Sequence, residues 1–306
     1  RVIVELGGDT PVEAATKKGV KYEKLSKNER KGLENAAINK QKAAKDKIKG
    51  KKVDIEYLQE FNAVVNGFSA KVKYADIQKI KEVSEVKEVY IATEYELPTE
   101  EPDMKYSKEL VQAQQAWRDF GLNGEGMVVG IIDSGIDPNH KDFVLTDASN
   151  VKLSADFVNG VISDHELPGK YFNEKVPYGW NYMDNTAVIL DSNANTAMHG
   201  MHVAGTVGAN GDEDNNGIKG VAPEAQLLAL RVFGENVATT YGDIYIKAID
   251  DALKLGADVL NMSLGSPAGF VNEQSPEQQA VKRAVDNGVI VSISAGNSNY
   301  FGDGYF

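Results

Sequence analysis

Residues 127–137 read Met-Val-Val-Gly-Ile-Ile-Asp-Ser-Gly-Ile-Asp, an apolar run that leads into a short polar segment. The apolar run from Val128 to Ile132 is nearly continuous, which predicts a strand covered on both faces of a sheet, and it ends on the carboxylate of Asp133. Similar runs and helical stretches alternate along the chain, with runs at 226–233, 258–264 and 288–295 and helices at 107–120, 199–209, 243–255 and 276–287. This alternation predicts an α/β fold, a doubly wound parallel sheet with helices on both faces. Ligands gather at the carboxyl ends of such strands.

The lysine-rich first hundred residues follow a different pattern. We predict a strand at 1–5, a helix at 28–49, two strands within 61–72 around the turn pair Asn66-Gly67, a helix at 74–83 and a strand at 86–92. This order predicts a small α+β domain. The segment Leu97-Pro98-Thr99-Glu100-Glu101-Pro102 reads as a linker, because two prolines interrupt regular structure. We therefore predict domains at 1–100 and 101–306, with residues 148–195 forming an irregular excursion at the sheet edge.

Composition excludes several classes of protein. The chain has 306 residues, 42% hydrophobic and 25% charged, which suits about two globular domains. It has no cysteine, which excludes disulfides and thiolate metal sites, and no apolar run long enough for a membrane span. The net charge is −12, and neither interleaved aromatics nor a recognised motif accompanies the lysines, so nucleic acid is not an expected partner.

Three polar side chains stand where strands or helices begin or end. Asp133 follows the strand described above, His199 begins an apolar helix in Met198-His199-Gly200-Met201-His202, and Asn297 ends the run Ser294-Ala295-Gly296-Asn297. Taken singly, Asp133 also suits a turn cap, and a histidine such as His202 is more often structural. Together, an acid, an imidazole and an amide are what serine-type acyl transfer requires apart from its nucleophile.

Four blocks resemble the subtilase family of subtilisin-like serine proteases, and they occur in family order. They are Asp133-Ser134-Gly135-Ile136-Asp137, His199-Gly200-Met201-His202-Val203-Ala204-Gly205, Asn261-Met262-Ser263-Leu264-Gly265 and Ser294-Ala295-Gly296-Asn297. The resemblance implies the catalytic roles of orienting acid for Asp133, general base for His199 and oxyanion donor for Asn297. It also implies that an extended substrate pairs with two edges, one formed by Ser263, Leu264 and Gly265 and the other by Ala238 and Thr239. Ser294, Ala295 and Gly296 would form the wall of the main specificity pocket.

The region before the linker is similar to the inhibitory prosegment of this family, with a ferredoxin-like α+β fold. The resemblance implies that residues 1–100 act as folding chaperone and inhibitor. The residues that follow the strand at 86–92 would lie extended through the cleft as a product-like strand, and the chain would be cut near Glu100. Met201 stands where most of the family has threonine. Together with the segments 176–182 and 297–302, it resembles the cell-envelope proteinase branch of lactocepins and C5a peptidases. The Gly-Thr-Ser-Met-Ala block that carries the family's nucleophile is absent from these 306 residues. We therefore expect the remaining part of the catalytic domain to supply it.

The loop Asn210-Gly211-Asp212-Glu213-Asp214-Asn215-Asn216-Gly217-Ile218 offers oxygen ligands of the kind that Ca²⁺ prefers. An EF-hand is rejected, because Pro223 stands where its last glutamate belongs. The family resemblance implies a calcium site formed by this loop through Asp214, Asn216 and Ile218, together with Asp142 and Asp103. A solvated acidic turn is the alternative interpretation of the same residues.

The leading hypothesis is the precursor of a secreted or cell-wall-associated serine endopeptidase that acts on peptides and proteins by a Ser-His-Asp mechanism. A non-catalytic binding or adhesion protein with the same fold is the alternative. A third hypothesis is that residues 1–100 act as a free protease inhibitor.

Overall fold

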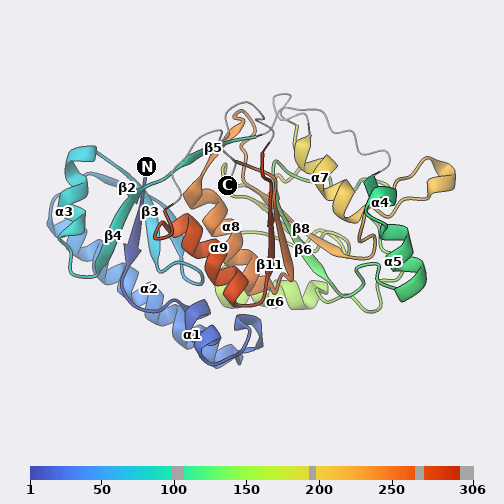
Figure 1. Ribbon diagram of the computed structural model, residues 1–306. Coiled ribbons are helices and arrows are strands. Elements are labelled where there is room, and N and C mark those ends of the chain that lie inside the picture. The colour runs from blue at the N-terminus through green and yellow to red at the C-terminus, as the bar shows by residue number, and fades with distance from the viewer. Residues whose placement is uncertain (98–106, 193–197, 266–271, 297–306) are drawn as a thin grey trace. The chain divides into compact units, whose positions relative to one another are not determined.

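The computed structural model describes residues 1–97, 107–192, 198–265 and 272–296. The chain forms two compact units, which we call unit 1 and unit 2 and describe separately (Figure 1). Unit 1 comprises Arg1–Glu94, Tyr241–Lys254 and Phe270–Ile290, and unit 2 comprises Tyr95–Thr240, Leu255–Gly269 and Val291–Phe306. The predicted domain boundary at residue 100 lies outside the described residues. Within the described part of the chain, no helix has the length and apolar character that a membrane crossing requires.

Unit 1 is built on a four-stranded sheet in the order β2-β3-β1-β4. Its elements are β1 (Val2–Leu6), α1 (Pro11–Lys17), η1 (Tyr22–Lys24), α2 (Lys27–Gly50), β2 (Ile55–Phe61), β3 (Gly67–Val72), η2 (Tyr74–Asp76), α3 (Ile77–Lys81), β4 (Val86–Ile91), α8 (Gly242–Leu255) and α9 (Pro276–Asp286). β1 pairs with both β3 and β4 in antiparallel register. The predicted order of strands and helices is confirmed, with α1 and η1 inserted between the first strand and the long helix.

The long predicted helix is α2, and its start and its buried face both follow from the sequence. Ser26 caps the helix in a reciprocal capping box with Glu29, which satisfies two backbone donors at the start. Ala37, Ala44 and Ile48 recur at helical spacing and are buried. Ala44 and Ile48 belong to one core cluster with the strand residues Val2, Val4 and Phe68. This cluster holds α2 against the sheet.

Two strands around Asn66-Gly67 are present as predicted, because β2 and β3 pair in antiparallel register, but their connection is 62–66 and not Asn66-Gly67 itself. Gly67 is the first residue of β3 and pairs with Glu5 of β1, and the strand before the connection is Ile55–Phe61. A side chain at position 67 would lie 2.1 Å from the carbonyl oxygen of Val4. Glycine is therefore required here because two backbones approach closely, not because of a turn.

Unit 2 is built on a five-stranded sheet in the order β11-β10-β6-β8-β7. Its elements are α4 (Ser107–Leu110), α5 (Ala113–Phe120), β6 (Val128–Asp133), α6 (Ala155–His165), β7 (Tyr178–Asn181), α7 (His199–Gly208), η3 (Glu213–Asn215), β8 (Gln226–Arg231), β10 (Val259–Met262) and β11 (Ile290–Ile293), and short strands β5 (Glu94–Glu96) and β9 (Thr239–Tyr241) pair beside it. β6 pairs in parallel with β8 and β10, and β7 pairs in parallel with β8. The predicted α/β fold is confirmed.

Two details of unit 2 differ from the sequence predictions. The helix predicted at 107–120 is divided into α4 and α5, because Gln112 has a left-handed backbone with φ of 60°. The excursion at 148–195 is partly regular: it contains α6, capped by Ser154, and β7, which extends the sheet beside β8. Short elements within a polar segment give too few periods for sequence patterns to reveal them.

Candidate functional site

The register of the unit 2 sheet brings four strand ends to one edge. Asp133 is the last residue of β6 and is paired with Arg231, the last residue of β8. Ile132 of β6 is paired with Met262, the last residue of β10. Ser263 comes directly after Met262, just as Asp133 comes directly after Ile132, so the two residues stand at the same end of the sheet. Ser294 follows β11, and its backbone N–H donates to the carbonyl of Met262 at 3.1 Å. The carboxyl ends of these strands therefore form a single edge that carries the predicted site residues.

Asp133 and His199, which are 66 positions apart in sequence, meet at this edge. His199 Nδ1 lies 2.8 Å from Asp133 Oδ1, and the aspartate side chain is 1% exposed while the histidine is 16% exposed. An ionised carboxylate only accepts hydrogen bonds, so Nδ1 carries the proton of the neutral ring. Nε2 is then left with the lone pair that a general base needs.

A second carboxylate affects the same imidazole. Burial alone lowers the pKa of His199, but the hydrogen bond to Asp133, the Asp133 charge and the Asp191 charge raise it, and the net pKa lies above its ordinary value of 6.5. Asp191 is itself 1% exposed. Sequence analysis did not identify Asp191, because it lies in the irregular segment 148–195 and approaches His199 only through the fold.

The backbone around Asp133 fixes the position of the helix that bears His199. Asp133 Oδ1 also accepts the N–H of Ser134, and Ser134 Oγ accepts the N–H of Gly200 at the start of α7. A side chain at position 200 would lie 2.5 Å from the carbonyl oxygen of Gly135 and 2.7 Å from its nitrogen. Glycine at this position therefore allows α7 to approach the loop after β6.

Met201 and Arg231 hold the surrounding loops. Met201 Sδ lies 2.8 Å from the backbone nitrogen of Asp137, so the residue that departs from the family pattern contacts the loop after β6. Arg231 is fully buried and donates to the carbonyls of Val188 and Leu190. The intervening Ile189 accepts the N–H of Ile136. Arg231 was not identified as a site residue, although a charge at the end of a buried strand is a visible signal.

The two predicted substrate-binding edges both bind an extended segment of the chain. The N–H of Glu96 donates to the carbonyl of Gly265 at 3.0 Å, and the N–H of Leu97 donates to the carbonyl of Ala238 at 3.0 Å. Thr239, beside Ala238, is in β9. Tyr95 and Leu97 are each 5% exposed. The segment therefore bonds to both edges and buries alternate side chains, as a strand added by β-augmentation does.

The remaining predicted binding residues lie near these edges or outside the described residues. Ser263 Oγ accepts from Asn261 Nδ2, and Leu264 is buried with its carbonyl accepting from Ser294 Oγ at 3.3 Å. Ala295 and Gly296 follow Ser294 at the same edge. Asn297, the predicted oxyanion donor, and Asp103, a predicted calcium ligand, both lie outside the described residues.

The predicted calcium ligands that are described come together, but their oxygens face protein donors. The Asp142 carboxylate accepts the N–H of Ile218 at 3.2 Å, and the carbonyl of Ile218 accepts the N–H of Gly211. The carbonyl of Asn216 accepts from Lys141 Nζ at 2.8 Å. Among the described residues, no group of three acidic, histidine or cysteine side chains forms a metal site, and Asp214 is exposed. These oxygens already accept hydrogen bonds from protein donors, so no step below uses a calcium ion, and calcium binding stays a prediction.

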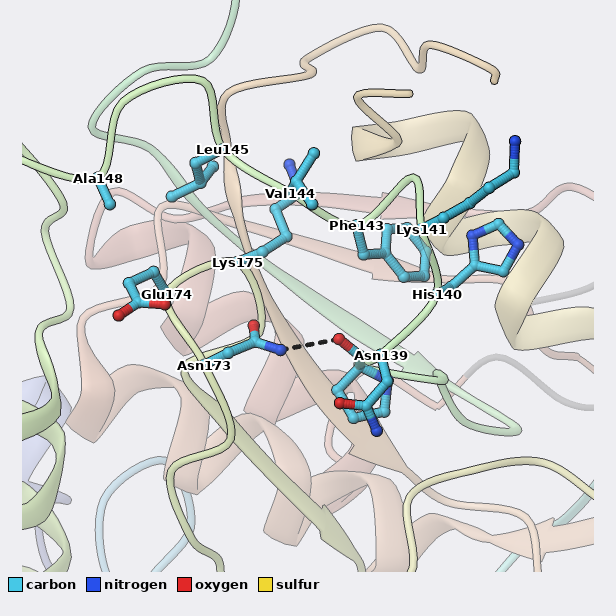
Figure 2. A pocket seen from close by; sticks show the side chains of 11 residues that line it. Asn139, His140, Lys141, Phe143, Val144, Leu145, Ala148, Asn173, Glu174 and Lys175 are labelled. Carbon is cyan, nitrogen blue, oxygen red and sulfur yellow. Dashed lines mark hydrogen bonds between the residues drawn. The ribbon is translucent and has the colours of Figure 1, made fainter. Parts of the chain in front are cut away.

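A pocket of about 410 Å³ in unit 2 has a lining that includes neither Asp133 nor His199 (Figure 2). It is lined by Pro138, Asn139, His140, Lys141, Phe143, Val144, Leu145, Ala148, Asn173, Glu174 and Lys175. Asn173 Nδ2 donates to the carbonyl of Pro138 across its wall. Lys175 is buried, and its ammonium donates to the carbonyls of Pro223 and Ala225. Burial lowers the pKa of Lys175 to about 7, against the opposing charge of Glu224.

Comparisons with known proteins agree with this geometry. Residues 124–305 match the model of the Subtilase family, peptidase S8. The chain is 47% identical over 248 residues to the PI-type proteinase of Lactococcus lactis subsp. cremoris, covering 80% of this chain and 13% of that protein. It is 34% identical to the minor extracellular protease Vpr of Bacillus subtilis, covering 97% of this chain and 33% of that protein. A C5a peptidase of Streptococcus pyogenes is 36% identical over 58% of this chain and 15% of its own length.

A similar fold has been solved for fervidolysin of Fervidobacterium pennivorans, a keratinolytic enzyme related to subtilisin. The TM-score is 0.55 at 20% sequence identity, and the match covers 87% of this chain and 39% of that one. At this identity the likeness concerns the fold alone. The chain spans only about an eighth of the first curated relative, so the activity of a whole protein does not follow from these matches.

Proposed function

Because the chain belongs to the subtilase family, we propose that it is part of a serine endopeptidase precursor that hydrolyses peptide bonds. The observation that carries the proposal is the Asp133–His199 pair at 2.8 Å, at the edge where an extended segment is held by Gly265 and Ala238. The two edges at Gly265 and Ala238 bind an extended backbone between them, and we call the space between them the groove. An acid and an imidazole in this geometry, beside such a groove, suit acyl transfer from a peptide.

The catalytic roles follow from the proton positions. His199 Nε2 accepts the proton of a serine hydroxyl as that hydroxyl attacks the scissile carbonyl, and it then returns the proton to the leaving amine. The ring becomes an imidazolium in between, and Asp133 and Asp191 stabilise that charge. We assign the serine to a Gly-Thr-Ser-Met-Ala block outside these 306 residues, and the oxyanion donor to Asn297.

The proposal includes an inhibitory and chaperone role for residues 1–100. Glu96 and Leu97 bond to the two groove edges in the way that a bound peptide would. In unit 1, the buried Asp250 of α8 accepts the N–H groups of Ala63 and Val64 at 2.7 and 2.8 Å. These contacts support a segment that blocks the groove and packs on part of the catalytic chain, and cleavage near Glu100 would release it.

The relatives and the segment at residues 96 and 97 indicate a location for the protein and a class of substrate. The relatives include a minor extracellular protease and named proteinases, which supports secretion or attachment to the cell wall and a peptide or protein substrate. The extended backbone contacts of residues 96 and 97 support a substrate bound as a strand.

A fluorophosphonate probe on the full-length protein tests the activity directly. We expect labelling of the matured protein, and the His199→Ala variant to lose it, since the serine then has no base. The matched control is His202→Ala, which alters an exposed histidine on the same helix. Absence of labelling in correctly folded, matured wild-type protein would refute the proposal and support the non-catalytic binding protein. Sequencing of the matured N-terminus, expected between residues 95 and 108, tests the prosegment.

A further inference from the structure

The C-terminal end of α9 is covered by a segment that precedes the long helix of the N-terminal domain. This segment, residues 10–25, contains α1 and η1, and it belongs with α9 to unit 1. Figure 1 shows the blue α1 beside the red end of α9, and the two helices are in contact. Sequence analysis predicted no structure between residues 6 and 27, so this contact was not expected.

Asn287, which caps α9, is the centre of the contact. Its side chain is 6% exposed, and its Oδ1 accepts the backbone N–H of Tyr22 at 2.9 Å. Its Nδ2 donates to Thr16 Oγ1 at 3.2 Å and to the carbonyl of Val20 at 3.4 Å. One amide thus binds three points of the segment, and both of its polar atoms are used. An amide suits this position because the site needs an acceptor and two donors together.

Neighbouring residues of α9 extend the same contact. Arg283 is 7% exposed; its Nη1 donates to the carbonyl of Val64 at 2.8 Å, and its Nε lies 3.1 Å from a carboxylate oxygen of Glu13. Gly288 has φ of 86°, and a side chain there would lie 3.0 Å from Lys21 Cε. The positive φ favours glycine at this position, and the flexible Lys21 side chain of the segment lies beside it.

The segment is ordered by the same contact. Tyr22 is fully buried, and its hydroxyl donates to Glu34 of α2, which links the segment to the sheet-bearing part of unit 1. Thr10 and Glu13 form a capping box that starts α1, so Glu13 serves both the helix start and Arg283. The segment and the end of α9 therefore form a fitted surface rather than an incidental contact.

We propose that Asn287 makes the end of α9 a docking site for residues 10–25 of the N-terminal domain, separate from the groove strand and from the Asp250 contacts of α8. The docking site retains the domain after the linker is cut, through the hydroxyl of Thr16 and the backbone of Val20 and Tyr22. This inference rests on the proposed inhibitory role of residues 1–100. Loss of one buried amide that makes three hydrogen bonds should speed release by about 10- to 100-fold.

Hydrogen exchange in the 306-residue chain tests the docking without any need for activity. We expect Asn287→Ala to raise the exchange rate of the amides in 14–25, that of Tyr22 most, by about 10- to 100-fold. Asn287→Asp keeps the acceptor for Tyr22 and loses both donors, so its effect should be intermediate. The matched control is Val285→Ala, two residues earlier on the same helix and 50% exposed, which should leave these amides unchanged. Equal exchange in Asn287→Ala and wild type would overturn the docking site.

The full-length precursor tests the consequence for release. We expect the delay between linker cleavage and the appearance of peptidase activity to shorten about 10- to 100-fold in Asn287→Ala and to be unchanged in Val285→Ala. An unchanged delay would overturn the proposed retention. A wild-type precursor that never becomes active, or that is active without any delay, would instead contradict the proposed function. The hydrogen-exchange experiment would still decide whether the docking site exists.

Discussion

Replacing Asp133 by asparagine separates the position of the imidazole from its protonation. Asparagine has nearly the same shape, but its Nδ2 donates where the carboxylate accepts, at the atom now 2.8 Å from His199 Nδ1. A ring that accepts at Nδ1 carries its proton on Nε2, where the general base needs a lone pair. We expect the kcat proposed for the full-length protein to fall about 10⁴-fold, the loss measured for the equivalent change in a serine protease.

The same substitution should lower the pKa of His199. Burial alone lowers this pKa, and the hydrogen bond and charge of Asp133 are the main influences that raise it, with a further contribution from Asp191. In the wild type, the raised pKa adds stability that is fully present below pH 6.5 and is lost as the pH rises through the pKa of the folded state. The variant should lack this linked stability, and the acid limb of its residual kcat/KM profile should move to lower pH.

Two measurements check these effects. Hydrolysis of a fluorogenic peptide across pH gives kcat and the acid limb, and NMR titration of the 306-residue chain gives the pKa of His199, with the other three histidines as internal references. A kcat within about tenfold of wild type, or a His199 pKa that is unchanged or higher, would refute the assignment of Asp133 as the orienting acid.

Four further predictions concern packing, burial and metal. Gly200→Ala should lower activity at least about 100-fold, because the added carbon meets backbone at 2.5 Å, while Gly205→Ala on the same helix, with its nearest atom at 3.7 Å, should stay near wild type in a kinetic assay. Lys175→Met should remove the part of the pH dependence of stability that this lysine causes. Its lowered pKa means that the folded wild type binds fewer protons than the unfolded chain between about pH 7 and 10. Over this range the unfolding free energy of the wild type should therefore rise relative to that of the variant, by up to about 1.4 kcal/mol per pH unit in denaturant titrations. Ile48→Ala should destabilise unit 1 by about 2–5 kcal/mol in urea unfolding, since the side chain is fully buried in its core. Excess chelator should leave the thermal unfolding temperature unchanged, because the oxygens of loop 210–218 already face protein donors; a fall would establish the calcium site predicted from sequence.

Most of the fold could be predicted because its elements carry strong periodic patterns. The apolar run ending at Asp133 appears as β6, and the uninterrupted stretch 28–49 appears as α2 with one residue more at each end. The errors arise where tertiary contact decides. Gly67 suits a turn in sequence, yet it is a strand residue facing Val4, and β7 exists because β8 offers an edge for pairing.

The candidate site divides in the same way. Asp133 and His199 could be predicted because each lies in a recognisable block, and the structure brings them within hydrogen-bonding distance. Asp191 and Arg231 could not be assigned in advance, because their effect depends on a loop folding back over the strand ends. Asn287 belongs to this second class, since an asparagine after a helix reads only as a cap until the segment that it binds is known.

Gly130, in the middle of β6, explains why the strand ends are aligned. A side chain at this position would lie 2.6 Å from Leu260 Cδ2 and 3.1 Å from Leu230 Cδ1. The leucines of β10 and β8 therefore fill the space over the glycine. Leu260 is the residue of β10 paired with Gly130, and Leu230 lies on β8 two residues after Leu228, the residue paired with Gly130 there. A slip of one residue would bring Ile131 beneath these leucines and turn Asp133 to the opposite face of the sheet. The close packing at Gly130 thus fixes the register, and the register places the carboxylate where the imidazole of His199 can reach it.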